Sequence, residues 1–165
     1  MLRDEELLLA LLNSAPVIEG VPTDGLEGAA GRELARSWGG KGSADELALL
    51  TRVRRALQTI VREDDGTAVG ELAGVLDDAV RTPRITPSGV VWELHVPEDD
   101  RLVAGVVLAW SNVITEFPGR LRACANDECT QFLVDHSRPG TAKWCSMAVC
   151  GNRMKARTHA RRAKS

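Results

Sequence analysis

Aromatic residues are scarce in this sequence, and tyrosine is absent. Four Trp and two Phe are the only aromatic side chains among 165 residues, whereas 44% of the residues are hydrophobic. The core must therefore consist of Leu, Val, Ala and Ile, which suits packed helices. A chain of this length forms one ordinary domain, or a domain with a small additional module.

Long apolar runs are also missing. No run approaches the roughly 18 apolar residues that a transmembrane helix requires, and residues 1–6 lack the positively charged region that begins a secretory signal peptide. We therefore expect a cytoplasmic protein without a membrane span. Thiols stay reduced in the cytosol, so its cysteines are expected to bind metal rather than to form disulfides.

The usual combinations of catalytic side chains are absent as well. The three histidines are His95, His136 and His159, and none has a nearby cysteine or Ser–Asp constellation that is separate from the metal-binding segment described below. Acidic pairs such as Asp77-Asp78 are adjacent in sequence, and adjacent residues of a helix do not converge on one point. We therefore expect a protein that is not an enzyme.

Acidic side chains are missing from the C-terminal end of the chain. Residues 136–165 contain eight basic residues and no acidic one, whereas residues 1–135 contain the other 13 basic and all 23 acidic residues. The overall net charge of −2 therefore hides a basic end on an acidic body. Such segregation is typical of a protein whose basic segment contacts nucleic acid.

The four cysteines all fall within residues 124–150. They form two C-x4-C pairs separated by fifteen residues: Cys124, Cys129, Cys145 and Cys150. Paired cysteines on either side of a loop of this length are the pattern that tetrahedral zinc requires. Because the protein fills all four positions, we expect one structural Zn²⁺ in a closed site. Two disulfides or an iron–sulfur cluster are the alternatives.

Hydrophobic periodicity predicts four helices in the first half of the chain. They cover residues 4–13, 26–38, 43–62 and 67–80. Ser43 and Glu46 are expected to form a capping box at the start of the third helix. The basic residues of that helix are expected to be solvated: Arg52, Arg54, Arg55 and Arg62. Asn13 is expected to cap the first helix in the left-handed conformation, or else to face a ligand.

A hairpin and a central helix follow. Alternating apolar residues over 90–96 predict a half-buried strand, paired with residues 84–86 through a turn at 87–89. Such a hairpin requires a helical surface beneath it. The helix expected after Pro97 is apolar on most sides and ends near Phe117, so it should be central to the fold. We place a domain boundary after it, dividing residues 1–118 from residues 120–165.

The N-terminal helical domain is expected to sense a ligand or to dimerise. A small-molecule effector would bind in a pocket between its helices. The candidate residues are Asn13, Trp92 and Trp110. The alternative is that both tryptophans belong to the core. A homodimer is a further expected partner, because a regulator that reads a palindromic site must be dimeric.

The C-terminal module is expected to end in a basic helix over residues 147–164. Ser146 stands at its N-cap, and Cys150 in its first turn, where the helix dipole stabilises a thiolate. Lys143 and Arg153 are expected to offset the charge of the four thiolates. Because cations occupy two faces of this helix, with only a seam of alanines between them, phosphates are expected along it. A solvated basic tail is the alternative.

Nucleic-acid contacts are expected from this helix and the loop before it. Asn152, Arg153 and Arg157 suit base edges, because Asn pairs with adenine and Arg with guanine. The outer cations suit phosphates. The full set of expected contacts is Arg138, Lys143, Asn152, Arg153, Lys155, Arg157, Arg161, Arg162 and Lys164.

The sequence of residues 145–155, Cys-Ser-Met-Ala-Val-Cys-Gly-Asn-Arg-x-Lys, resembles the CGNR zinc finger. The upstream pair Cys124-x4-Cys129, residues 132–135 and Trp144 fit the same pattern, so the resemblance covers residues 120–164. More weakly, residues 9–14, residues 24–26, Trp38 and residues 52–57 resemble the ABATE domain that precedes this finger. The family is one of stress-responsive bacterial transcription regulators.

The resemblance implies zinc ligation by the four cysteines and binding to double-stranded DNA. The fold expected from all these observations is mainly α with a small β-hairpin (α+β). An N-terminal helical domain precedes a treble-clef-like zinc module that ends in the basic helix. Two other functions use the same residues: RNA binding through the basic helix, and protein interaction by an adaptor in which the zinc module is only a scaffold.

Overall fold

The computed structural model describes residues 2–63 and 66–162, which fold into helices and short antiparallel strand pairs. The helices are α1 (Leu2–Leu12), α2 (Gly28–Ser37), α3 (Ala44–Glu63), α4 (Val69–Leu76), α5 (Arg101–Glu116) and α6 (Asn152–Arg162). The strand pairs are β1 (Val17–Ile18) with β2 (Val21–Pro22), β3 (Val80–Thr86) with β4 (Gly89–His95), and β5 (Leu121–Ala123) with β6 (Phe132–Val134). The short helical turns are η1 (Gly66–Ala68), η2 (Glu98–Asp100) and η3 (Met147–Gly151). The expected α+β fold is confirmed.

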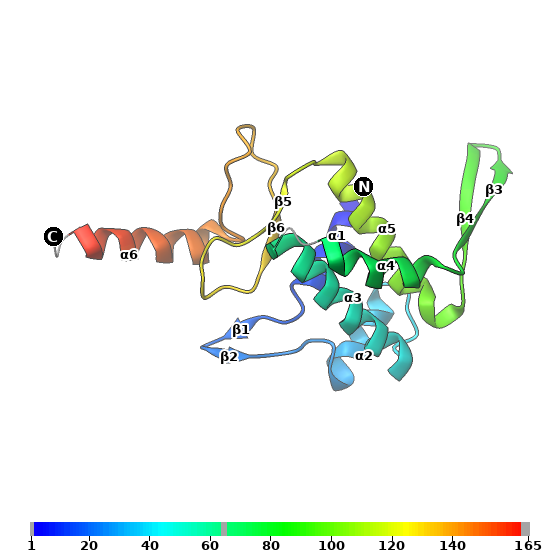
Figure 1. Ribbon diagram of the computed structural model, residues 1–165, viewed down its shortest axis with the longest axis horizontal. Helices are drawn as coiled ribbons and strands as arrows, with labels where there is room; N and C mark the ends of the chain where they lie inside the picture. Colours follow the sequence, from blue (N-terminus) through cyan, green and yellow to red (C-terminus); the bar gives the residue numbers. More distant parts are fainter. Residues whose placement is uncertain (1, 64–65, 163–165) are drawn as a thin grey trace.

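The core lies around α5, as its all-round apolar sequence predicts. α1, α3 and α4 pack against this helix (Figure 1). The buried residues of α5 are Leu102, Val103, Ala104, Val106, Val107, Ala109 and Val113. They meet leucines and valines from α1 and α3, so the core is aliphatic, as the shortage of aromatic residues requires. None of the helices formed by the described residues has the length and the apolar composition that a membrane crossing requires.

The predicted capping box at the start of α3 is present with one change. The Ser43 hydroxyl accepts a hydrogen bond from the Glu46 backbone N–H at 3.1 Å. The Glu46 carboxylate accepts one from the backbone N–H of Gly42 at 2.6 Å, one residue before the position that the box predicts. Glu46 is fully buried, so the start of α3 is fixed within the fold rather than on its surface.

The expectation that Arg54 is solvated is wrong. Its guanidinium is buried and makes two hydrogen bonds to the Asp24 carboxylate, at 2.7 and 2.5 Å, and one to the Ser14 hydroxyl at 2.8 Å. The loop after α1 places Asp24 over the face of α3 that carries Arg54, so a charge on the inner face of the helix has a bidentate partner. Arg52 and Arg55 lie on the outer face of the same helix and are exposed, as expected.

The predicted hairpin forms as β3–β4, but its turn is one residue shorter than expected and it does not lie in the expected place. Thr86 pairs with Gly89 across the two-residue turn, and the ladder continues to Val80 and His95. Instead of lying half-buried on the helices, the hairpin projects from the end of the body (Figure 1). It is held at its base, where β3 follows α4 and β4 leads into η2.

The strand pair β5–β6 joins the C-terminal module to the helical body. Phe132 and Val134 of β6 are buried in the same core cluster as the leucines of α1 and α3. Arg62, at the end of α3, lies over the Phe132 ring at 4.6 Å from its centroid and donates to the Thr130 carbonyl at 2.8 Å. The proposed division near residue 119 therefore separates two segments that share one hydrophobic core.

Candidate metal centre and basic helix

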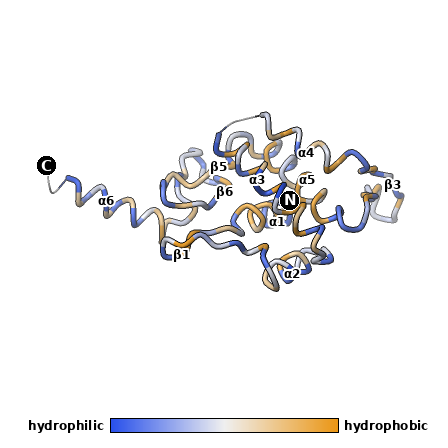
Figure 2. Tube along the Cα trace, turned by 60° about the horizontal axis from the view of Figure 1, so that its bottom comes forward, coloured by the Kyte–Doolittle hydropathy of each residue, from blue (hydrophilic) through white to orange (hydrophobic). Residues whose placement is uncertain are grey.

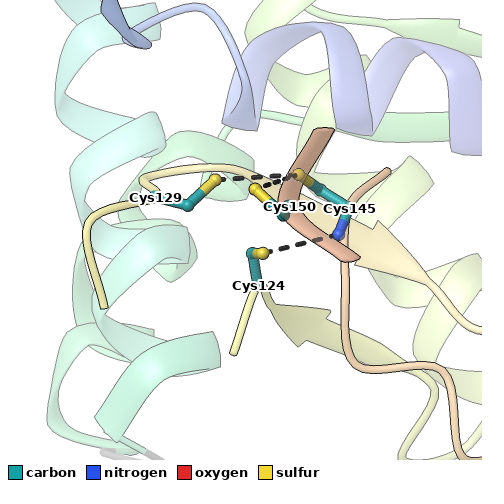
Figure 3. A group of neighbouring side chains, drawn as sticks. All are labelled: Cys124, Cys129, Cys145 and Cys150. Carbon is teal, nitrogen blue, oxygen red and sulfur yellow. Dashed lines mark hydrogen bonds between the residues drawn. The ribbon is translucent and has the colours of Figure 1, made fainter. Parts of the chain in front are cut away.

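The four cysteine sulfurs converge at one point of the C-terminal module (Figure 3). All four Sγ atoms lie within 4.8 Å of one another, with 3.6 Å from Cys129 to Cys145 and 3.7 Å from Cys145 to Cys150. A tetrahedral ion with Zn–S bonds of about 2.3 Å separates its sulfurs by about 3.8 Å. The donor set and its spacing therefore fit one structural zinc ion.

Two short turns present these sulfurs. In the first, Cys124 follows β5, and the N–H of Gln131 points at the Cys129 sulfur over 3.5 Å. In the second, the N–H of Cys145 points at the Cys124 sulfur over 3.5 Å. Backbone N–H groups aimed at sulfur favour the thiolate form, which is the form that binds metal.

Asn126 is a buried part of the site that sequence reasoning missed. It lies between the first two cysteines, with only 1% of its surface exposed. Its side-chain amide donates to the Cys150 sulfur at 3.5 Å, and its carbonyl oxygen accepts from the Glu128 N–H at 3.4 Å. Asn126 therefore links the first turn to a ligand of the second. In the sequence, only its position in a polar stretch between paired cysteines indicated that Asn126 could belong to the site.

The thiols differ in their acidity. Burial raises the pKa of the Cys129 and Cys145 thiols above the ordinary value. Burial also opposes ionisation of Cys150, but the Asn126 amide and the neighbouring cysteines outweigh it and lower the pKa of that thiol. A dication is the natural counter-charge for such a cluster, because metal binding displaces the thiol protons.

Asp135 organises the loop between β6 and the second cysteine pair. Its carboxylate is buried and accepts hydrogen bonds from the Ser137 hydroxyl at 2.6 Å, the Ser137 N–H at 2.8 Å and the Ala142 N–H at 3.0 Å. Arg120 and Arg122 lie beside it, at 3.6 and 3.5 Å. The Ser137 hydroxyl, more than any other group, holds the pKa of the Asp135 carboxyl below its ordinary value. This residue, too, was not predicted as part of the site.

The basic helix begins with a wider turn than expected. The Ser146 hydroxyl accepts from the Val149 N–H at 3.3 Å, so the predicted N-cap is confirmed. The first turn is a π-helical turn, and regular α-helix begins only at Asn152. Gly151 is buried in this turn, where a Cβ atom would lie 2.8 Å from the Met147 sulfur and 3.2 Å from Trp144. The glycine of the Cys-Gly-Asn-Arg sequence therefore makes room for these two side chains.

The helix α6 projects from the body as a mostly hydrophilic rod (Figures 1 and 2). It buries none of its residues. The predicted nucleic-acid residues that lie exposed on it are Asn152, Arg153, Lys155, Arg157, Arg161 and Arg162. Arg138 and Lys143 are exposed in the loop before the second cysteine pair, and Lys164 lies outside the described residues. Asn152 also bonds within the helix, donating to the Ala148 carbonyl at 3.3 Å.

The two cationic faces of α6 have different surroundings. On one face, Arg157 donates hydrogen bonds to both oxygens of the Glu128 carboxylate, at 2.6 and 2.7 Å. This interaction lowers the pKa of the Glu128 carboxyl and ties the helix to the first cysteine turn. Arg153 borders an open groove beside the ligands, together with Cys129 and Cys145. Arg153, one of the two residues predicted to offset the thiolate charge, therefore lies beside the cluster.

The other face of α6 borders a second open groove. The residues that line it are Trp144, Met154, Lys155, Thr158, His159 and Arg162. The groove therefore combines a half-buried indole with cations spaced along the helix. Such a combination of aromatic and basic side chains can contact both the bases and the phosphates of a nucleic acid.

The three residues named as effector contacts are not brought together. Asn13 does not cap α1 in the left-handed conformation; its side chain instead bonds the backbone of Phe132 in β6. Trp92 is exposed on the projecting hairpin, and only Trp110 packs against the core. The apolar cavity between α1, α2, α3 and α5 measures about 10 Å³, the space of about one water molecule.

Four cysteines on two turns, with sulfurs spaced for one tetrahedral ion, define a zinc-finger module. Residues 120–163 match the CGNR zinc finger family. The resemblance of the C-terminal segment is thereby confirmed, whereas the helices α1 to α5 lie outside the matched residues. No curated protein matches the chain.

Proposed function

We propose that the protein is a transcription regulator that binds double-stranded DNA through its zinc finger and α6. The helical body would be the regulatory part, as the ABATE resemblance of residues 9–14 and 52–57 implies. The proposal requires a reducing compartment such as the cytoplasm, where the four thiolates persist. The ion has a structural role in it, because the protein supplies all four ligands.

The observation that carries the proposal is the exposed cationic helix α6. A helix that fully buries none of its residues gains little from packing, and its cations repel one another. Phosphates along the helix would relieve that repulsion, and binding would release counterions from the nucleic acid. The zinc ion, by fixing the turn from which α6 starts, would hold the helix in a defined direction from the body.

We infer that the groove beside Trp144 is the face that meets the nucleic acid. Lys155 and Arg162 border this groove, whereas Arg157 on the opposite face already binds Glu128. The acidic Glu128 would repel a phosphate approaching that side. The aromatic face of Trp144 adds a surface on which a sugar or a splayed base can stack.

The test compares two matched double variants in the zinc-loaded, full-length protein. Lys155→Ala with Arg162→Ala removes two cations of the groove, and Arg52→Ala with Arg55→Ala removes two exposed cations of α3. Binding to a labelled random-sequence DNA duplex is followed by fluorescence anisotropy over a range of salt concentrations. The slope of log K against log salt should become shallower by about 0.9 for each phosphate that is no longer neutralised, or about 1.8 in the first variant. The α3 variant should keep the slope of the unchanged protein.

Three results would overturn the proposal. The first is zinc-loaded protein that fails to bind DNA at low salt. The second is an equal loss of binding in the α3 variant, which would mean that general charge and not α6 attracts the DNA. The third is preferential binding of structured RNA in competition with the duplex, which would assign the helix to RNA instead.

A further inference from the structure

The hairpin β3–β4 has two chemically different faces. Residues directly opposite each other in an antiparallel ladder point to the same side. The register pairs Pro83 with Trp92 and Ile85 with Val90, so these four side chains share one face, which we call the apolar face. Leu94 extends it toward the base of the hairpin, and its only charged neighbour on that side is Arg81.

The opposite face carries polar contacts between the strands, together with Val80 and Val91. Arg84 binds Glu93 across the strands, and the Thr82 hydroxyl lies 2.6 Å from the His95 ring nitrogen. The polar side chains of this face therefore have partners within the hairpin and can stay in water. A hairpin that is polar on one side and apolar on the other has the pattern of a sheet with one covered face.

The apolar face is nevertheless uncovered in the single chain. Ile85 is 85% exposed, Trp92 60% and Val90 58%. The hairpin points away from the helices, so no described element lies over it (Figure 1). An isolated two-stranded hairpin is only marginally stable in water, and one that exposes a tryptophan and an isoleucine requires a surface to pack on.

We propose that the apolar face is a dimer interface, covered by the same face of a second copy of the chain. The face bears no acidic group and has one cation at its base, so charge does not select an acidic or a basic partner. The apolar face fits an uncharged, flat sheet face of the same size. A second copy of the chain supplies such a face. Two such faces can pack about 10 Å apart, as the layers of a sandwich do.

A two-fold axis explains the distribution of large and small side chains on the face. The large Trp92 pairs with the smaller Pro83, and the next pair on the same face is Ile85 with Val90. In an interface with two-fold symmetry, residue i of one copy meets residue j of the other, and j meets i. An axis between the two pairs would set each Trp92 against the Ile85–Val90 pair of the second copy.

The area of the apolar face is sufficient for the centre of a dimer interface, but not for the whole of one. The exposed parts of Ile85, Val90 and Trp92 amount to roughly 400 Å², about half of the roughly 800 Å² that each partner buries in a standard interface. Pro83, Leu94 and the stem of Arg81 add to it at the rim. The apolar face thus supplies the desolvated centre that a stable dimer needs.

The experiment uses two neighbouring valines that point to opposite sides. Val90→Glu places a carboxylate on the apolar face, and Val91→Glu places the same group on the polar face beside Arg84. Sedimentation equilibrium of the zinc-loaded, full-length proteins without nucleic acid gives the dimer dissociation constant. We expect a dimer for the unchanged chain and for Val91→Glu. Val90→Glu should weaken dimerisation by on the order of a hundredfold or more, because two carboxylates are buried per dimer.

Equal zinc content and helical circular dichroism in the two variants show that both are folded. A monomeric unchanged chain at concentrations up to about 100 μM would overturn the proposal and assign the face to a different partner. Equal dissociation constants for Val90→Glu and Val91→Glu would overturn it too, since the interface would then lie elsewhere. Because no nucleic acid is present, the result is independent of whether α6 binds DNA.

Discussion

The side-chain amide of Asn13 forms hydrogen bonds with the backbone of Phe132, 119 residues further along the chain. Its nitrogen donates to the Phe132 carbonyl at 3.2 Å, and its oxygen accepts from the Phe132 N–H at 2.7 Å. The Asn13 side chain at the end of α1 thereby pairs with the edge of β6 that faces away from β5. A second interaction joins the same halves of the chain, because the His136 ring lies 2.9 Å from the Glu5 carboxylate. The zinc module is thus tied to the first helix of the body.

Replacing Asn13 by Ala should weaken the whole protein. Two backbone groups of β6 would lose their partners in a partly buried place, at a cost of about 1–3 kcal/mol. Urea unfolding of the zinc-loaded protein measures the loss. Asn112→Ala is the control, because the Asn112 amide bonds Asp4 on the exposed surface and should change stability by less than about 0.5 kcal/mol. Equal effects of the two variants would contradict the coupling.

The buried guanidinium of Arg54 should matter far more than its exposed neighbour Arg55. Truncation to Ala leaves the Asp24 carboxylate and the Ser14 hydroxyl without their common donor, and breaking a buried pair of this kind costs about 3 kcal/mol. Arg55→Ala should cost less than about 0.5 kcal/mol. Denaturant unfolding of both variants provides the comparison. A small effect of Arg54→Ala would mean that the loop after α1 rearranges to release Asp24 into water.

The pair also predicts a dependence of stability on pH. Hydrogen bonding from Arg54, the largest influence, lowers the pKa of the Asp24 carboxyl from the ordinary value of 3.8. The pair therefore stabilises the fold fully above that value, and its contribution is lost as pH falls through the lower pKa of the folded state. The stability difference between the unchanged protein and Asp24→Asn should be greatest near neutral pH and should shrink below pH 3.8. A difference that is constant between pH 6 and pH 3 would contradict this.

Local sequence signals predicted the zinc site and the capping residues Ser43 and Ser146. The spacing of the four cysteines predicts the converging sulfurs, because a tetrahedral ion needs two pairs of ligands on short turns. The Ser146 cap and the capping box of Ser43 and Glu46 also depend on neighbours within a few residues. The alternating strand at 90–96 and its turn were predicted for the same reason: the register of a hairpin is set by its own turn.

Three of the features that sequence reasoning missed depend on partners far along the chain. Arg54 was expected in water because nothing near it in sequence shows that Asp24 folds over α3. Asn13 was expected to cap its own helix, although its partner is 119 residues away. The apolar face of β3–β4 was expected to lie on the helices, because alternation predicts that a face is covered but not which surface covers it.

Asp135 is expected to control zinc affinity without touching the ion. Asp135→Asn keeps the shape of the side chain but gives it an amide nitrogen that cannot accept from the Ala142 N–H. The loop that leads to Cys145 would then lose the hydrogen bond that holds Ala142 in place. Zinc affinity should therefore fall by about tenfold. Competition with a chromophoric chelator measures the change. Asp127→Asn removes an exposed carboxylate between the first two cysteines and should leave the affinity within about twofold.

Replacing Glu128 by Gln should strengthen nucleic-acid binding if α6 is the binding helix. The carboxylate of Glu128 occupies the Arg157 guanidinium and repels phosphate, so its neutral isostere releases a cation on the second face of the helix. Binding to the random-sequence duplex should tighten, and log K should depend more steeply on log salt, because an acidic group beside the binding helix has been removed. Asp127→Asn removes the same charge from the neighbouring residue without releasing Arg157, so it separates a general charge effect from the release of this side chain. Weaker binding by Glu128→Gln, with zinc content unchanged, would mean that the pair instead holds α6 in its binding orientation.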